Sequence, residues 1–238
     1  MSLIITTYVR EGIVMSSDSR LSINNKSLDI KNVTQSDSVR KTFVTQRGVG
    51  ISTCGSADIK GVPIAGYIDS FISEIIADSI PSVKEVTSKL LEYFRKLNPD
   101  LQTIFHIAGY DIVKEVDFET REQKIYRCHI SNNTIEEINK VRNVQGSIFN
   151  GYHNIIAKLL NTVYIKNADG KPEVEIPFNG LAWSFLTLQD AIDFNRFGTQ
   201  TTIDAMKFEM TDKTVGGPID ILVITPNYHK WVQHKELK

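Results

Sequence analysis

Cysteines are scarce and long apolar runs are absent in this 238-residue sequence. The cysteines, Cys54 and Cys128, both lie in segments that predict strands, which favours reduced thiols in a cytoplasm over a disulfide framework. No apolar run reaches the roughly 18 residues that a membrane-spanning helix needs. We also expect no secretory leader, because a basic stretch followed by an apolar one is absent at the start. These features predict a cytoplasmic protein that has no membrane partner.

No excess of one charge is present either. The chain has 27 Lys and Arg residues against 28 Asp and Glu residues, so no global field favours nucleic acid or an anionic surface as a partner. The five histidines are scattered, and no cysteine pair has the spacing of metal ligands. We therefore expect no nucleic-acid partner, no metal site and no cofactor.

The hydrophobic pattern predicts blocks of strands that alternate with pairs of helices. One helix is bounded by a capping box, Ser82-x-x-Glu85, and by Pro99. In chain order, we predict strands over 3–9 and 12–19, a polar loop over 24–38, strands over 40–56, helices over 64–76 and 82–98, strands over 102–110 and 123–131, helices over 147–164 and 188–209, and a central strand over 216–225.

This order does not alternate strand and helix one by one, which argues against a doubly wound parallel sheet. Two mainly antiparallel sheets stacked face to face, with a helix layer on each outer side, accommodate it. No linker or internal repeat divides the chain. We therefore predict an α+β fold with four αββα layers in one domain, residues 1–238.

Five short motifs follow one another along the chain. They are GIVMSSDSR (12–20), RKTF (40–43), STCGSA (52–57), Gly146-Ser147, and Asp212 followed by Gly216-Gly217. In these motifs and in their order, the sequence resembles the β subunits of proteasomes and their bacterial relatives, which are N-terminal nucleophile hydrolases. That family separates its nucleophile from an aspartate by sixteen positions, as Ser2 and Asp18 are separated here, whereas Thr6 and Thr7 come too late.

The resemblance implies a peptidase or amidase whose nucleophile, Ser2, carries its own base. Removal of Met1 would expose the Ser2 α-amine, which has an ordinary pKa of about 7.7–8.0. A nearby Lys41 ammonium, positioned by Asp18, would favour the neutral amine. The other implied roles are an oxyanion-binding N–H at Gly55, a proton network completed by Ser147 and Asp212, and a substrate pocket at Ser22 and Thr53.

The family also implies assembly into a homo-oligomeric ring, and it leaves 165–185 as an insert. Whether an ATPase is a partner does not follow from the sequence. Two departures from the family pattern argue against catalytic activity. Ser2 stands where the family usually has Thr, and Val215 stands where active members have a small polar residue. A catalytically inactive scaffold is therefore the alternative, and an amidase for a small molecule is a third possibility that Lys41 argues against.

Overall fold

The computed structural model describes residues 2–25, 30–76, 82–114, 119–177 and 180–236. Its two large sheets are antiparallel throughout, so the predicted α+β class is confirmed. The first sheet has the order β12-β1-β2-β15-β16, comprising Gly146–Gly151, Leu3–Val9, Gly12–Ser17, Asp220–Ile224 and His229–Gln233. The second has the order β11-β10-β9-β6-β5, comprising Thr134–Glu137, Glu119–His129, Thr103–Lys114, Gly50–Gly55 and Thr42–Val44.

The β1–β2 hairpin forms as predicted, around a turn at Arg10 and Glu11. Every residue of both strands is buried, although several are Ser or Thr. The reason is that the first sheet is covered on both faces. Helix α4 (Leu188–Phe208) packs on one face, and apolar residues between the two sheets cover the other. This inter-sheet cluster consists of Tyr8, Ile13, Met15, Ala108, Ile125, Leu222 and Ile224.

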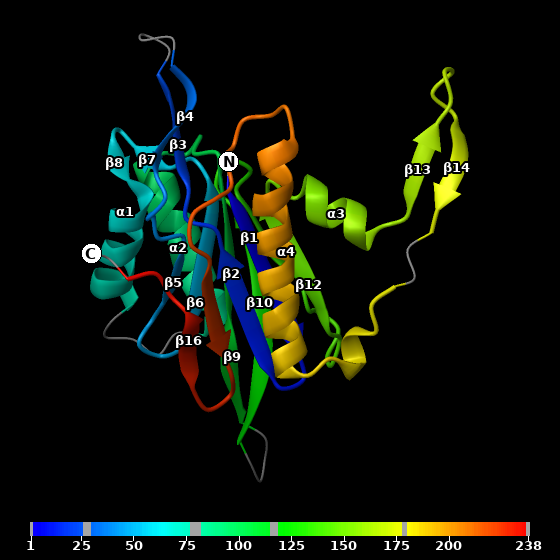
Figure 1. Ribbon diagram of the computed structural model, residues 1–238. Coiled ribbons are helices and arrows are strands. Elements are labelled where there is room, and N and C mark those ends of the chain that lie inside the picture. The colour runs from blue at the N-terminus through cyan, green and yellow to red at the C-terminus, as the bar shows by residue number, and fades with distance from the viewer. Residues whose placement is uncertain (1, 26–29, 77–81, 115–118, 178–179, 237–238) are drawn as a thin grey trace.

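The second sheet is covered by the helices that follow β6 (Figure 1). Helix α1 (Ile64–Ser70) continues into a π-helical segment, η2 (Phe71–Ile76), and α2 (Val83–Leu97) begins with the predicted capping box at Ser82. Phe71 and Phe94 bury their rings in the cluster between these helices and the sheet. None of the described helices is long and apolar enough to cross a membrane.

The helix predicted over 147–164 is wrong in its first part. Residues Gly146–Gly151 instead form the edge strand β12, which pairs with β1, and the helix α3 covers only Asn154–Leu160. Pairing with an already buried strand outweighs local helical preference here, a common tertiary override. The strand ends at Gly151, where the backbone has a φ of +90°.

Two further segments differ from the predicted loops. The polar loop expected over 24–38 includes a two-stranded ribbon of β3 (Leu21–Asn25) and β4 (Ile30–Ser36). The end of the helix predicted over 147–164 is also wrong, because Val163 begins the strand β13 (Val163–Lys166). This strand continues into the insert expected over 165–185 and pairs there with β14 (Pro172–Ile176), and the arm that they form stands away from the rest of the molecule (Figure 1). A short helix η3 (Trp183–Phe185) precedes α4. Residues Asp58–Ile59 and Val62–Pro63 form the small hairpin β7–β8.

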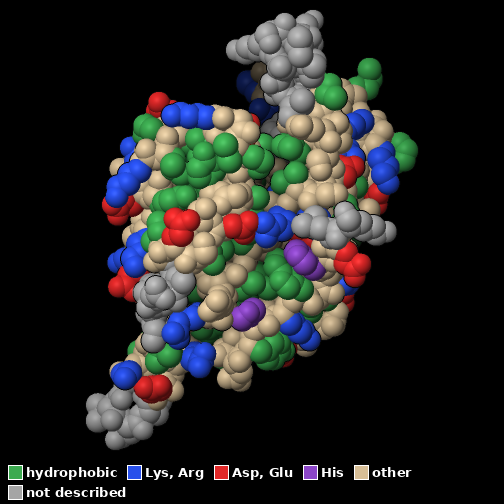
Figure 2. Space-filling view, turned by 90° about the vertical axis from the view of Figure 1, so that its left-hand side faces the viewer, with side chains coloured by type: hydrophobic (Ala, Val, Ile, Leu, Met, Phe, Trp, Pro, Cys, Tyr) green, Lys and Arg blue, Asp and Glu red, His purple; other side chains and the backbone are tan. Residues whose placement is uncertain are grey.

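The surface carries mixed charge. Figure 2 shows the face on the side of α1, where acidic and basic side chains are interspersed and a group of hydrophobic side chains is exposed. This mixture agrees with the formal net charge of −1.

Candidate active site

The Asp18 carboxylate lies at the end of β2 and is completely buried. Its Oδ1 accepts hydrogen bonds from the Leu3 backbone N–H at 3.0 Å and from Lys41 Nζ at 2.8 Å. Its Oδ2 accepts from the backbone N–H groups of Arg20 at 3.1 Å and Gly216 at 3.0 Å. One charged side chain therefore connects the start of β1, the start of β5 and the loop before β15.

Lys41 is the cation of this cluster and is 5% exposed. Besides Asp18, its ammonium donates to the Arg20 carbonyl oxygen at 2.6 Å. Burial lowers the pKa of Lys41, while the charge and the hydrogen bond of Asp18 act in the opposite direction. An ammonium has three donors, and these two bonds leave one for another acceptor.

Ser2 lies immediately before β1 and is 8% exposed. It lines two pockets, and Cys54 and Gly55 line both of them as well. The first pocket, of about 40 Å³, also contains Lys41. The second, of about 270 Å³, lies toward Thr103. Ser2 therefore borders two pockets.

Two glycines allow this close arrangement. Gly55 has a φ of +118°, and a Cβ there would lie 2.1 Å from the Gln102 carbonyl oxygen. Gly151 has a φ of +90°, and a Cβ there would lie 1.8 Å from the Ser2 carbonyl oxygen. Both positions require glycine, for conformation and for space. The Ser2 carbonyl also accepts a hydrogen bond from the Tyr152 N–H at 2.7 Å, which fixes the strand start.

The first pocket contains hydroxyl groups that lack hydrogen-bond partners. Within the described part of the chain, the buried oxygens Ser22 Oγ and Thr53 Oγ1 have no partner, and both residues line this pocket. Thr103 Oγ1 is in the same condition and lines the second pocket. A buried hydroxyl without a partner costs about 1–3 kcal/mol, so each of these oxygens requires a polar partner such as water or a ligand group.

The structure does not bring Ser147 to this site. Ser147 pairs with Thr7 across β12 and β1, five residues along β1 from Ser2, and its Oγ accepts a hydrogen bond from Thr7 Oγ1 at 2.9 Å. The interpretation of Gly146-Ser147 as the residues before a helix is therefore wrong, since they begin a strand. Gly151 is the glycine that lies against Ser2.

Asp212 is exposed, and it lies in the loop between α4 and β15. This loop reaches the site through Gly216, whose N–H binds Asp18. In the same loop, Val215 is buried in an apolar cluster with Leu3 and Tyr152. At this point the loop therefore makes an apolar contact with the residues that follow Ser2 and Gly151.

Other ionisable groups near Ser2 are held neutral or paired. Burial raises the pKa of the Cys54 thiol to about 12, so Cys54 is not a thiolate at neutral pH. His106 is buried between Thr6 Oγ1 and Asn150 Oδ1, at 3.0 and 2.9 Å, and burial lowers its pKa to about 4. Cys54 and His106 are therefore both neutral at pH 7, and Ser2 presents the hydroxyl that lines both pockets.

Sequence reasoning missed a second buried ion pair beside the site. Lys235 Nζ contacts Asp220 Oδ2, and Asp220 pairs with Ser17 on the neighbouring strand β2. Both side chains are buried, and Asp220 also accepts from the Lys235 N–H at 2.9 Å. A lysine in a polar C-terminal segment has no sequence signal for burial. Sequence reasoning also missed Gly151, although a glycine shortly before a helix is a sequence signal for a turn.

The chain matches no protein-family model and no curated protein sequence. Among the residues that the structure describes, no three His, Cys, Asp or Glu side chains are grouped so that they could hold a metal ion.

Proposed function

We propose that this protein is a proteasome-like N-terminal nucleophile hydrolase that cleaves peptide or amide bonds with Ser2. The observation that carries the proposal is the buried Asp18–Lys41 pair: Asp18 is hydrogen-bonded to the start of β1, and Lys41 lines the same pocket as Ser2. The two stacked sheets and the helices on their outer faces support the αββα sandwich of that family as the finer description of the fold.

In the proposed reaction, removal of Met1 exposes the α-amine of Ser2. This amine takes the hydroxyl proton as Ser2 Oγ attacks the carbonyl carbon, and it then passes that proton to the leaving amine. The Lys41 charge keeps the amine neutral before the attack, and Gly55 supplies an N–H to the carbonyl oxygen as it gains negative charge. Water then hydrolyses the ester on Ser2.

The pocket that contains Thr53 supports a restricted substrate class. It is narrow, at about 40 Å³, and its unpartnered hydroxyl groups on Ser22 and Thr53 need a donor or acceptor. A substrate with a small polar side chain before the scissile bond satisfies both conditions. We expect Thr53→Val to lower kcat/KM for such substrates about tenfold, because the loss of a hydrogen bond costs about 1.4 kcal/mol.

Labelling by an electrophile that is selective for N-terminal hydroxyl nucleophiles tests the proposal. Mass spectrometry should show loss of Met1 and a single adduct on Ser2 of the wild-type protein. Ser2→Ala should give no adduct, and Ser2→Thr, which keeps the hydroxyl, should restore it. Hydrolysis of peptides by Ser2→Ala at the wild-type rate, or activity of protein that quantitatively retains Met1, would refute the role of Ser2.

A non-catalytic scaffold is the second candidate, and two observations favour it. Ser147 is remote from Ser2, and Val215 packs among apolar residues where active family members have a polar one. Each observation removes one member from the proton network that the resemblance implies. Under this alternative, Ser2 is not labelled even after Met1 is removed.

We also propose that copies of the chain assemble into a homo-oligomeric ring. The β13–β14 arm supports assembly, because an isolated two-stranded hairpin is marginally stable and this one exposes apolar side chains. Ile165 and Ile176 are 50% and 51% exposed, and Phe208 at the end of α4 is 87% exposed. Light scattering should show a particle of several subunits. Ile165→Asp/Ile176→Asp should dissociate this particle, whereas the control Lys166→Asp should not. A wild-type monomer at micromolar concentration would refute assembly.

A further inference from the structure

A second polar pocket lies at the end of the sheets opposite Ser2. Strand β1 runs from Leu3, next to the candidate active site, to Val9, and Arg10 follows in the turn. Val9 and Arg10 line a pocket of about 550 Å³. This pocket shares no residue with either pocket at Ser2, so it is a separate site.

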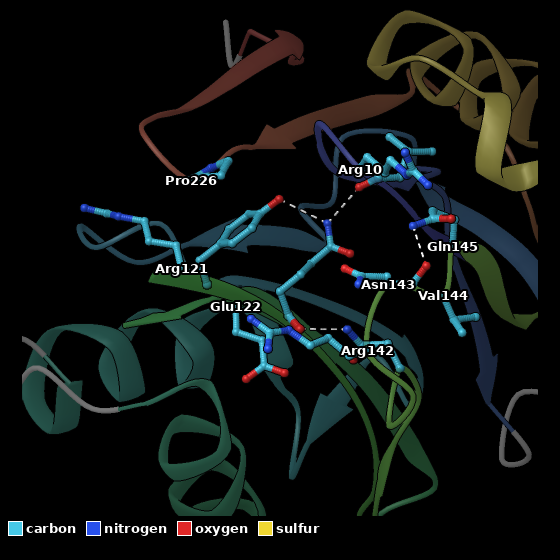
Figure 3. Close-up of a pocket in the computed structure, with 12 residues that line it drawn as sticks. Arg10, Arg121, Glu122, Arg142, Asn143, Val144, Gln145 and Pro226 are labelled. Carbon is cyan, nitrogen blue, oxygen red and sulfur yellow. Dashed lines mark hydrogen bonds between the residues drawn. The ribbon is translucent and has the colours of Figure 1, made fainter. Parts of the chain in front are cut away.

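Three arginines from different parts of the chain line this pocket. Arg10 lies in the β1–β2 turn, Arg121 lies on β10, and Arg142 lies in the segment between β11 and β12. Figure 3 shows them on different sides of the pocket. Across the described residues, none of the three guanidinium groups forms an ion pair. The single acidic residue of the lining, Glu122, lies 3.3 Å from Lys124 Nζ and is thus already paired.

The neutral part of the lining is rigid and presents a donor. Gln123 Nε2 shares its two N–H donors among the carbonyl oxygens of Val9 and Gly12, at 3.0 and 3.2 Å, and the Tyr110 oxygen, at 3.0 Å. These bonds tie the β1–β2 turn to the second sheet. Because the Tyr110 oxygen accepts from Gln123, its own O–H is left to donate to a ligand. Burial raises the pKa of Tyr110, which keeps this proton in place at neutral pH.

A neighbouring pocket of about 330 Å³ extends the positive region. Arg121 lines both pockets, and the neighbouring pocket adds Arg47. Like-charged side chains around one space repel one another, and this repulsion is relieved when an anion binds between them. Guanidinium groups suit phosphate and carboxylate groups because their planar forks donate two parallel hydrogen bonds.

We propose that the pocket formed by Arg10, Arg121 and Arg142 binds a small polyanion that carries two or more phosphate or carboxylate groups. Its volume is within the range of small-molecule sites, and its lining is polar where such sites are usually apolar. Several arginines need several negative groups, so a single monovalent anion would leave most of the charge unmatched. The proposal does not depend on the role of Ser2.

Isothermal titration at constant ionic strength tests it, with inorganic pyrophosphate and citrate as separate probes. Binding of pyrophosphate alone identifies phosphate as the ligand chemistry, and binding of citrate alone identifies carboxylate. Arg121→Gln and Arg142→Gln should each weaken binding of the active probe at least tenfold, since hydrogen bonds to charged groups are strong. Both side chains are exposed, so these variants should unfold at the wild-type temperature.

Lys171→Gln is the matched control. It removes one positive charge from the exposed end of the β13–β14 arm, far along the chain from the pocket, and it should bind the probe as the wild type does. The proposal is overturned if neither probe binds the wild-type protein. It is also overturned if Arg121→Gln/Arg142→Gln binds the probe as tightly as Lys171→Gln, because the binding then does not depend on these arginines.

Discussion

Replacing Lys41 by Met keeps most of the aliphatic chain and removes the ammonium from the ion pair with Asp18. At the Nζ–Oδ1 distance of 2.8 Å, the attraction is about 6 kcal/mol for an effective dielectric constant of about 20, and dehydration of both groups offsets much of it. Removing one partner of a buried pair costs about 3–5 kcal/mol. Asp18 keeps three backbone N–H donors, so we expect a loss near the lower limit, about 3 kcal/mol of unfolding free energy.

The reciprocal change, Asp18→Asn, should destabilise the fold for a different reason. An amide NH₂ would face the backbone N–H groups of Arg20 and Gly216, so donors would meet donors. In this orientation the Asn Oδ1 would still accept from Lys41, but the Lys41 ammonium would lose its buried negative partner. Combining Lys41→Met with Asp18→Asn removes both charges together. The double variant should therefore be at least about 2 kcal/mol more stable than the sum of the single losses predicts.

Urea unfolding of the four proteins at pH 7 measures this cycle, with equal m-values as the check on two-state behaviour. Lys114→Met is the matched control, because its ammonium lies 3.5 Å from Glu119 on the exposed surface, where the pair is screened by solvent. No measurable change is expected for the control. Additive losses in the cycle, or a Lys41→Met protein as stable as the control, would refute the reasoning that this pair is buried and coupled.

Three other perturbations test neighbouring parts of the structure. Burial lowers the pKa of His106 from 6.5 to about 4, so the folded state favours the neutral ring. The unfolding free energy should therefore fall by about 3 kcal/mol as the pH drops from 6.5 to 4. Urea unfolding at several pH values in this range should show a smaller fall for His106→Gln. Lys235→Met leaves Asp220 buried without its cation and should lower the unfolding free energy by about 3 kcal/mol in the same assay, whereas the exposed Lys230→Met should not. Gly151→Ala should abolish labelling of Ser2 and should destabilise the fold far more than Gly170→Ala. Gly170 has a similar φ of +76° but open space around it, so its replacement should cost about 1–2 kcal/mol. Equal losses of thermal stability in the two variants would contradict the contact between Gly151 and Ser2.

Local patterns were sufficient for the elements whose ends carry a chemical signal. The Ser82 side chain caps α2 and Glu85 completes the box, because both bonds form within one turn of chain. The β1–β2 hairpin follows in the same way from a short turn between two β-branched runs. Such features depend on neighbours in sequence, so the sequence alone predicts them.

The error at 147–164 shows where that reasoning stops. Gly146 and Gly151 are the same type of residue, and apolar residues at helical spacing follow each of them. Their backbones differ, because Gly151 has a positive φ and touches Ser2, while Gly146 begins the strand that pairs with β1. Glycine permits both conformations, so its presence does not reveal which one the tertiary contacts select. The unpartnered Ser22 and Thr53 hydroxyl groups are equally hidden, since burial without a partner is a property of the assembled pocket.

The spacing of sixteen between Ser2 and Asp18 has a structural cause in the hairpin itself. Val9 pairs with Gly12 across the turn, and this register continues to Ile4 opposite Ser17, which places Asp18 beside Leu3. The Asp18 N–H donates to the Leu3 carbonyl, and the Leu3 N–H donates to the Asp18 carboxylate. A carboxylate at this position meets the residue that follows Ser2, so it holds the strand start without occupying the space around the hydroxyl. Since a shift of one residue in a strand reverses the facing of every side chain, the same spacing in another chain implies the same contact only when the turn is equally short.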